Sequence, residues 1–230
     1  MYQFFIEDEN AAEDFVTIEG SDVNHIKNVL RMRPGEKIRV CTRSGQNYFC
    51  SISDITESFV RADILEKEAE STELPCRIYL FQGLPKNDKM EWIIQKTVEL
   101  GVYEVIPVAM KNCVVKLDDK KAKSKVMRWQ AIAESAAKQS KRSLIPEVKM
   151  PMSYKEAVAY AKELDVKLVP YENEHGMAGT KAAMEQIEKG ESIAVFIGPE
   201  GGFAPEEIAL VQDEMQLISL GKRILRTETA

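Results

Sequence analysis

The sequence contains few histidines, no closely spaced pair of cysteines and no long apolar run. Its two histidines, His25 and His175, are too few and too far apart for a zinc site, so we expect no metal. The cysteines lack the short spacings of a disulfide framework, and we expect reduced thiols at Cys41, Cys50, Cys76 and Cys113. No run of about 18 apolar residues is present, so the sequence predicts no membrane-spanning helix.

A secretory leader is also missing from the start of the sequence. Residues 1–8 contain no basic residue and no extended apolar stretch, whereas a signal peptide has both. Together with the reduced cysteines, this absence predicts a cytoplasmic protein.

The chain also lacks net positive charge. Its formal charge of -6 at pH 7, taken as a single number, argues against a nucleic-acid partner. However, residues 111–149 hold eleven Lys/Arg against four Asp/Glu, and a second basic cluster at residues 31–43 lies within the acidic residues 1–72. A charged run is usually a solvated face, but two basic clusters in an acidic chain favour a nucleic-acid-binding surface.

Two hydrophobic patterns divide the chain near residue 72. In the first part, β-rich runs separated by turn signals predict a small barrel with strands at residues 2–6, 15–18, 37–41, 48–55 and 59–65. A short helix is predicted from Ser21 to about Arg31, and residues 66–73 are predicted to be a linker.

After residue 73, predicted strands alternate with helices. The strands cover residues 77–81, 102–108, 166–170, 192–197 and 216–220, and the helices include residues 88–101, 120–140 and one that begins at Pro205. This alternation predicts an α/β domain with a parallel sheet covered by helices on both faces.

Two irregular loops directly follow the last two predicted strands. The GPEGG loop is residues 198–202, and the C-terminal loop is residues 219–230, with the sequence SLGKRILRTETA. Ligands of open α/β sheets bind at the carboxyl ends of the strands, and glycines there let the backbone approach a flat ligand. The residues predicted to line this pocket are Tyr171, Glu172, Gly198, Pro199, Glu200, Gly201, Gly202, Leu220, Gly221, Ile224, Leu225, Arg226 and Thr229.

Taken alone, the GPEGG loop also fits a tight turn before a helix or an anion site at a helix start. An ATP-type phosphate loop is disfavoured, because no Gly-Lys-Ser/Thr sequence follows. A simple surface turn has no reason to include the block from Leu220 to Ala230, so the two loops together favour a ligand pocket.

Together, the two loops resemble the cofactor loops of SPOUT-class RNA methyltransferases. Their residue sequences are most similar to those of the small-subunit ribosomal RNA methyltransferase E family. Members of that family methylate N3 of a uridine in bacterial 16S ribosomal RNA. The resemblance covers most of the chain, because His25-x-x-x-Val29-Leu30-Arg31, residues 96–102 and Gln139-Ser140-x-Arg142 are similar to further family signatures.

The resemblance implies a PUA-like RNA-binding barrel in residues 1–72 and a SPOUT-type catalytic domain with a C-terminal trefoil knot in residues 73–230. It also implies a homodimer that acts on 16S ribosomal RNA or the small ribosomal subunit. Family members continue past the Glu-Thr-Ala sequence into a final helix, so we expect such a helix to follow Ala230. The predicted phosphate contacts are Arg31, Arg33, Arg39 and Arg142.

The implied cofactor is S-adenosylmethionine, whose sulfonium is already activated, so the protein has to align donor and acceptor and deal with the proton on N3. A base can remove that proton, or a cation can stabilise the uracil anion. Arg226 and Glu228 are the candidate catalytic residues, with Lys96 and Arg142 as weaker candidates. The alternative is a structural Arg226–Glu228 pair that only holds the loop.

Two other functions remain open at this point. One is a non-catalytic RNA-binding protein with an S-adenosylmethionine-binding domain, against which the intact Arg226-Thr227-Glu228 sequence argues. The other is a nucleotide-binding enzyme whose glycine-rich loop binds phosphate.

Overall fold

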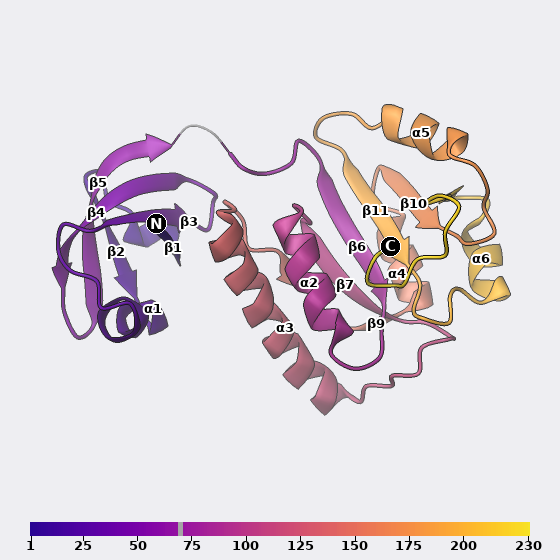
Figure 1. Cartoon of the computed structure of the whole chain (residues 1–230), viewed down its shortest axis with the longest axis horizontal. Helices are drawn as coiled ribbons and strands as arrows, with labels where there is room; N and C mark the ends of the chain where they lie inside the picture. Colours follow the sequence, from indigo (N-terminus) through magenta and orange to yellow (C-terminus); the bar gives the residue numbers. More distant parts are fainter. Residues whose placement is uncertain (69–70) are drawn as a thin grey trace. The chain divides into compact units, whose positions relative to one another are not determined.

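The computed structural model describes residues 1–68 and 71–230, which divide into two compact units (Figure 1). Unit 1 comprises Met1–Glu73 and Ser135–Ile145, and unit 2 comprises Leu74–Glu134 and Pro146–Ala230. The sequence predicts a single boundary after residue 72 and shows no sign that residues 135–145 group with the first unit. Residues 69 and 70, in the predicted linker, lie outside the described residues.

Unit 1 is built on a five-stranded sheet with the order β1-β3-β4-β5-β2. Its strands are β1 (Tyr2–Ile6), β2 (Phe15–Glu19), β3 (Lys37–Thr42), β4 (Asn47–Ile55) and β5 (Phe59–Glu68). Strands β1 and β3 are parallel and the other neighbours antiparallel, with register shifts between β4 and β5. Such bulges bend and twist the strands that contain them, so the sheet curls.

All five predicted strands of this unit are present. Strand β5 is longer than predicted, so residues 66–68 belong to the sheet and not to a linker. The predicted helix is split into α1 (Ser21–Asn24) and the π-helix η2 (His25–Val29), and a short 3-10 helix, η1 (Asp8–Asn10), follows β1.

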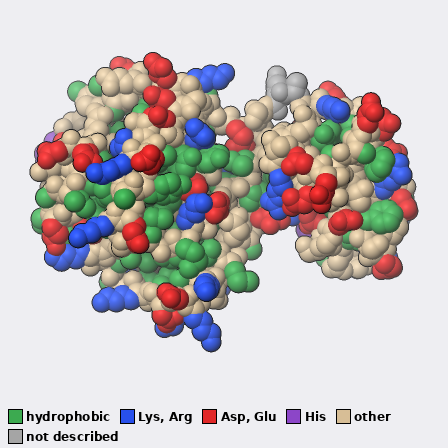
Figure 2. Space-filling view, turned by 180° about the vertical axis from the view of Figure 1, so that it is seen from behind, with side chains coloured by type: hydrophobic (Ala, Val, Ile, Leu, Met, Phe, Trp, Pro, Cys, Tyr) green, Lys and Arg blue, Asp and Glu red, His purple; other side chains and the backbone are tan. Residues whose placement is uncertain are grey.

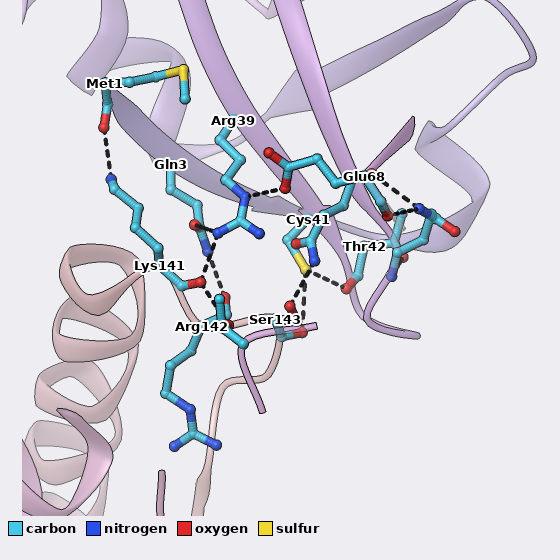
Figure 3. A network of polar contacts seen from close by, with 12 residues as sticks. Met1, Gln3, Arg39, Cys41, Thr42, Glu68, Lys141, Arg142 and Ser143 are labelled. Atoms are coloured by element: carbon cyan, nitrogen blue, oxygen red, sulfur yellow. Dashed lines mark hydrogen bonds and ion pairs between the residues drawn. The ribbon is translucent and has the colours of Figure 1, made fainter. Parts of the chain in front are cut away.

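Strand β3 is buried on both of its faces. Ile38 and Val40 point into the apolar core of unit 1 and are fully buried. On the opposite face, Arg39 and Cys41 are also buried, at 6% and 0% exposure. This second face is covered by residues 141–143, which explains why part of a distant segment groups with the sheet (Figure 3).

A buried polar network joins β3 to that segment (Figure 3). The Arg39 guanidinium donates to the Glu68 carboxylate at 2.6 Å and to the Lys141 carbonyl at 2.7 Å. The Cys41 thiol donates to the Ser143 carbonyl at 3.2 Å. Because buried polar groups are costly unless they are paired, the network specifies one position for residues 141–143 on the sheet.

Arg142 is the second buried arginine of unit 1. Its side chain is 4% exposed and forms an ion pair with Glu73, while its carbonyl accepts a hydrogen bond from Gln3 at 2.6 Å. The prediction that Arg39 and Arg142 contact phosphates is therefore wrong, because both guanidinium groups are buried against protein acceptors.

Unit 2 contains a seven-stranded parallel sheet in the order β12-β10-β11-β6-β7-β8, with β9 also paired to β7. Its strands are β6 (Arg77–Gly83), β7 (Glu104–Ala109), β8 (Glu147–Val148), β9 (Met152–Ser153), β10 (Val166–Pro170), β11 (Ser192–Ile197) and β12 (Gln216–Ile218). The predicted parallel α/β sheet is confirmed, and the short strands β8 and β9 were not anticipated.

The helices of unit 2 cover both faces of this sheet. They are α2 (Lys89–Glu99), α4 (Tyr154–Ala161), α5 (Ala178–Glu185) and α6 (Pro205–Val211); α3 (Asp119–Ser140) begins in unit 2 and extends into the residues grouped with unit 1. Helices α4 and α6 pack with one set of strand residues, and α5 packs with the alternate set. Alternate residues of a strand point to opposite faces, so the two apolar clusters lie on opposite sides of the sheet.

The centre of unit 2 is the pairing of β6 with β11. Phe81 and Phe196 are register partners on these strands, and their rings stack at 4.4 Å with an interplanar angle of 6°. Both side chains are fully buried, and each aromatic ring removes a large apolar area from water. This contact holds together the two strands whose ends approach the predicted pocket.

We expect Glu73→Gln to destabilise unit 1 by about 1.5–3 kcal/mol, because a hydrogen bond to a charged group contributes about that much. The change removes the negative charge that faces the buried Arg142 guanidinium. Amide hydrogen exchange of β3 and β4 should accelerate accordingly. Glu66→Gln, an exposed carboxylate on β5, is the matched control, and equal protection in the two variants would contradict the argument.

Candidate functional site

A pocket of ≈ 640 Å³ lies in unit 2, where the GPEGG loop and the C-terminal loop meet. Strands β12, β10, β11 and β6 are neighbours in that order, and all run parallel. Their carboxyl ends therefore meet at one edge. Pro170, Ile197 and Ser219, at or just after the ends of β10, β11 and β12, line the pocket, so it lies at this edge. This is the usual ligand position of an open α/β sheet.

All of the residues predicted to line the pocket do so, except Gly201 and Thr229. Sequence reasoning missed Lys89, Pro170, Glu174, His175, Ile197, Phe203, Ser219, Lys222, Arg223, Thr227 and Ala230. Most of these are neighbours of predicted residues. Lys89 is not, and no local pattern marks it, because it is the first residue of α2, six residues beyond the end of β6.

Gly201 faces the protein and not the pocket. A Cβ at this position would lie 3.0 Å from the Cβ of Asn112, whose side-chain amide donates to the Gly201 carbonyl at 3.0 Å. Gly202 has φ +65°, and a Cβ there would meet the Glu172 carboxylate at 3.0 Å. The glycines thus allow the GPEGG loop to contact Asn112 and Glu172 closely.

Thr227 connects the C-terminal loop to two strand ends. Its hydroxyl donates to the Gly198 carbonyl at 2.7 Å and accepts a hydrogen bond from the buried Gln82 amide at 3.0 Å. Gln82 lies on β6 and Gly198 directly follows β11. A single hydroxyl therefore fixes the C-terminal loop to both central strands, a role that no pattern in the sequence predicts.

Gly83, the last residue of β6, allows the GPEGG loop to pass directly above it. A Cβ on Gly83 would lie 2.7 Å from both the nitrogen and Cδ of Pro199. Backbone atoms cannot move aside as a flexible side chain can, so this position tolerates only glycine while the loop keeps its path.

A lysine bridges the two loops through their carboxylates. The Lys89 ammonium lies 3.1 Å from Glu200 Oε1 and 3.0 Å from Glu228 Oε2. Glu200 also accepts a hydrogen bond from the Lys86 backbone N–H at 3.0 Å. The Arg226 guanidinium is 4.0 Å from Glu228, and its side chain is 83% exposed on the pocket wall, so Arg226 is free to meet a ligand.

These contacts shift the pKa values of all three bridging groups. The pKa of Lys89 is raised, chiefly by its close contacts with the Glu228 and Glu200 carboxylates. The pKa of Glu228 is lowered, first by its own backbone N–H and then by Lys89. Burial acts to raise the pKa of Glu200, but backbone N–H groups and Lys89 outweigh it, and the pKa is lowered. The lysine therefore stays charged and both carboxylates stay ionised at neutral pH.

The candidate residues Lys96, Arg31 and Arg33 lie outside the pocket. Lys96 pairs with Glu99 on α2 and does not line the pocket. Arg31 and Arg33 are exposed on unit 1, and neither forms an ion pair with any described residue. Arg31 has φ +54°, an uncommon backbone conformation for a residue with a side chain.

Across residues 1–68 and 71–230, no group of His, Cys, Asp and Glu side chains is arranged to bind a metal ion. The helices in the same residues are all too short or too polar to cross a lipid bilayer.

Comparison with known families identifies both parts of the chain. A family model described as an RNA methyltransferase domain matches residues 72–230, and one described as an RNA methyltransferase PUA domain matches residues 18–65. The chain belongs to this RNA methyltransferase family. The parallel sheet and the curled N-terminal sheet are thus the catalytic-type and PUA-like folds that the sequence predicted.

Several known proteins are similar to this chain over nearly its whole length. The ribosomal RNA small subunit methyltransferase E of Bacillus subtilis (strain 168) is 39% identical over 100% of this chain and 93% of its own length. A crystal structure of the Neisseria gonorrhoeae protein of that name, bound to S-adenosylmethionine, is similar at a TM-score of 0.84 and 33% identity. It covers 100% of this chain and 93% of the other. A Legionella pneumophila structure with bound SAM has a TM-score of 0.84 at 29% identity, over 99% and 92% of the two chains.

We expect Gly83→Ala to destabilise unit 2 by about 1–3 kcal/mol, because the added methyl group overpacks the contact with Pro199. Gly179→Ala is the control, since its Cβ would meet no atom within 4 Å in helix α5. That control should be stabilising by about 0.5–1 kcal/mol. Tryptophan fluorescence in a denaturant titration reports on unit 2, because Trp92 and Trp129 both belong to it. A wild-type midpoint for Gly83→Ala would show that the GPEGG loop can move without cost.

Proposed function

We propose that this protein transfers the methyl group of S-adenosylmethionine to N3 of a uridine in the 16S ribosomal RNA of the small subunit. The observation that supports it most is the pocket formed jointly by the GPEGG loop and the C-terminal loop. Full-length relatives named ribosomal RNA small subunit methyltransferase E support the same function. We place the enzyme in the cytoplasm, where its RNA substrate is found.

The residues of the pocket fit S-adenosylmethionine. A volume of ≈ 640 Å³ is in the range of pockets for ligands of this size. Apolar side chains such as Leu220 and Leu225 suit a flat base, and carboxylates such as Glu172 and Glu174 suit ribose hydroxyls or a positive charge. Gly221 has φ +111°, and a Cβ there would meet no atom within 4 Å, so its backbone is open to a ligand. When bound, S-adenosylmethionine supplies a methyl group already activated by a sulfonium.

Arg226 and Glu228 are the proposed catalytic residues. A neutral uracil has no free lone pair on N3, so the N3 proton has to leave before or during the transfer, and solvent water takes it up. Glu228 is a weak proton acceptor, because its pKa is lowered. The exposed guanidinium of Arg226 suits the uracil anion, which a fixed cation stabilises. We therefore propose Arg226 as the anion-stabilising residue and Glu228 as the group that orients it.

The test is to map methylation on 16S ribosomal RNA by mass spectrometry, in cells with and without the gene and after complementation. The proposal predicts one N3-methyluridine that disappears and returns with the gene. Purified protein and S-adenosylmethionine should restore it on small subunits from the deletion strain. Cofactor binding by calorimetry without any methylated RNA would support the alternative of a non-catalytic RNA-binding protein.

Arg226→Ala and Glu228→Gln should lower kcat much more than they weaken the binding of S-adenosylhomocysteine. Interactions that strengthen only in the transition state affect the rate and not ground-state binding. The expected loss is about 100- to 1,000-fold for the cation, as for other stabilisers of a developing negative charge. Turnover within a few-fold of wild type in both variants would remove them from the mechanism.

We further propose that RNA phosphates bind the exposed arginines of unit 1. Arg31 and Arg33 combine exposure with the absence of an ion pair to any described residue. Residues 31–33 lie just beyond the π-helix η2, with Leu30 between them, and such helices occur frequently at functional sites. The match of residues 18–65 to an RNA methyltransferase PUA domain supports an RNA-binding role for this segment.

The double variant Arg31→Gln/Arg33→Gln should weaken RNA binding and flatten its dependence on salt. Each lost phosphate contact lowers the slope of log K against log salt by about 0.7–0.9. Binding of a 16S RNA fragment at several salt concentrations measures this slope. Lys155→Gln/Lys189→Gln removes the same charge from exposed positions of unit 2 and serves as control. If both doubles have the same slope, the two arginines only contribute to solubility.

We also propose that the protein is a homodimer and that its C-terminal region forms a trefoil knot. Exposed apolar side chains of unit 2 gather on one face among charged ones, as a dimer interface would require (Figure 2). Leu100 and Met127 are among the large apolar residues of unit 2, at 77% and 75% exposure. Sedimentation at micromolar concentration distinguishes a dimer from a monomer, and only the dimer agrees with this proposal.

A further inference from the structure

We infer that Lys89 is a positioning residue, which holds the GPEGG loop and the C-terminal loop together through Glu200 and Glu228 and keeps both carboxylates ionised beside the pocket. This inference rests on the proposed function for its effect on turnover, but its structural part can be tested without any RNA.

The three charged groups come from three different segments of the chain. Lys89 is the first residue of α2, Glu200 lies in the loop after β11, and Glu228 lies in the C-terminal loop after β12. The ammonium is within 3.1 Å of both carboxylates. It therefore forms an ionic link between three segments that are far apart in the sequence and that meet only at the pocket.

The Lys89 ammonium offsets the repulsion between the two carboxylates. Glu228 and Glu200 bind the same ammonium, so their carboxylates lie close together, although only Glu200 lines the pocket itself. Two nearby carboxylates repel each other, and without a cation one of them takes up a proton at higher pH. A neutral Glu228 could no longer orient the Arg226 guanidinium by its charge. Lys89 prevents this, since a single positive charge serves both carboxylates.

No neighbouring charge among the described residues replaces Lys89 between the two carboxylates. The Lys86 backbone N–H contacts Glu200 only, and the Arg226 guanidinium lies 4.0 Å from Glu228 but is mostly exposed. At the start of α2, Asp88 pairs with Lys125 and Glu91 pairs with Arg128. The further charged groups of the pocket wall are Glu172, Glu174, His175, Lys222 and Arg223. No ion pair to Glu200 or Glu228 from these residues is present in the described part of the chain.

The test titrates the glutamate carboxyl groups by carbon-13 NMR, and Glu200→Gln and Glu228→Gln assign the two signals. In the wild type both should titrate below the ordinary glutamate pKa. In Lys89→Met at least one should move upward by about one pH unit or more, as expected when an opposite charge is lost and a like charge remains. Lys89→Arg should return both signals to the wild-type position, because it restores the cation. Wild-type midpoints in folded Lys89→Met would overturn the inference.

A second readout is the pH profile of turnover. The acid limb of kcat should move upward in Lys89→Met and return in Lys89→Arg, while S-adenosylhomocysteine affinity at neutral pH changes less. Lys162→Met, which removes an exposed lysine paired with Glu214, is the control and should keep the wild-type profile. If Lys89→Met does not fold, Lys89→Gln replaces it, because the amide can still donate to one carboxylate.

The two proposals fail in different ways. If the wild-type protein methylates no RNA, the proposed function is wrong, while the NMR titration still decides whether Lys89 holds the carboxylates ionised. If the wild type is active but neither the carboxyl midpoints nor the acid limb depends on the charge at residue 89, the role of Lys89 is wrong and the proposed function stands.

Discussion

The parallel pairing of β6 with β11 is the constraint on which the rest of the site depends. Parallel strands end at the same edge of a sheet, so this pairing brings Gly83 and Gly198 close together although they are far apart in sequence. The stacked rings of Phe81 and Phe196 hold the pair in register. Once this edge exists, a glycine at the end of β6 and one threonine hydroxyl help to seat both loops around one pocket.

Buried charge serves different purposes in the two units. In unit 1, the enclosed Arg39 pairs with Glu68 and the Lys141 carbonyl (Figure 3), and the enclosed Arg142 pairs with Glu73. These two arginines specify how residues 141–143 attach to the sheet. In unit 2, Lys89 is only partly buried and its carboxylate partners lie beside a pocket that a ligand can enter. A fully enclosed pair stabilises one arrangement, whereas a charge at a pocket can act on what binds there.

Much of the fold could be predicted, because it depends on local patterns. Alternating apolar residues predicted all five strands of unit 1, and the strand–helix alternation after residue 73 predicted the parallel sheet. Short elements such as β8 and β9 carry too few residues for a pattern, and the grouping of residues 135–145 with unit 1 depends on contacts across a hundred residues. The two loops predicted most of the pocket wall, since every residue of a loop lies near its neighbours.

By itself, the sequence determined the longer strands of both units, the two loops and the family to which the chain belongs. Only the tertiary structure decided which charges are free. Arg39 and Arg31 look equivalent in the sequence, yet one is 6% exposed beneath residues 141–143 and the other lies in solvent. Lys89 shows no motif, and its role follows from two glutamates more than a hundred residues away. A local pattern records what a residue prefers, whereas burial and pairing depend on segments that only folding brings together.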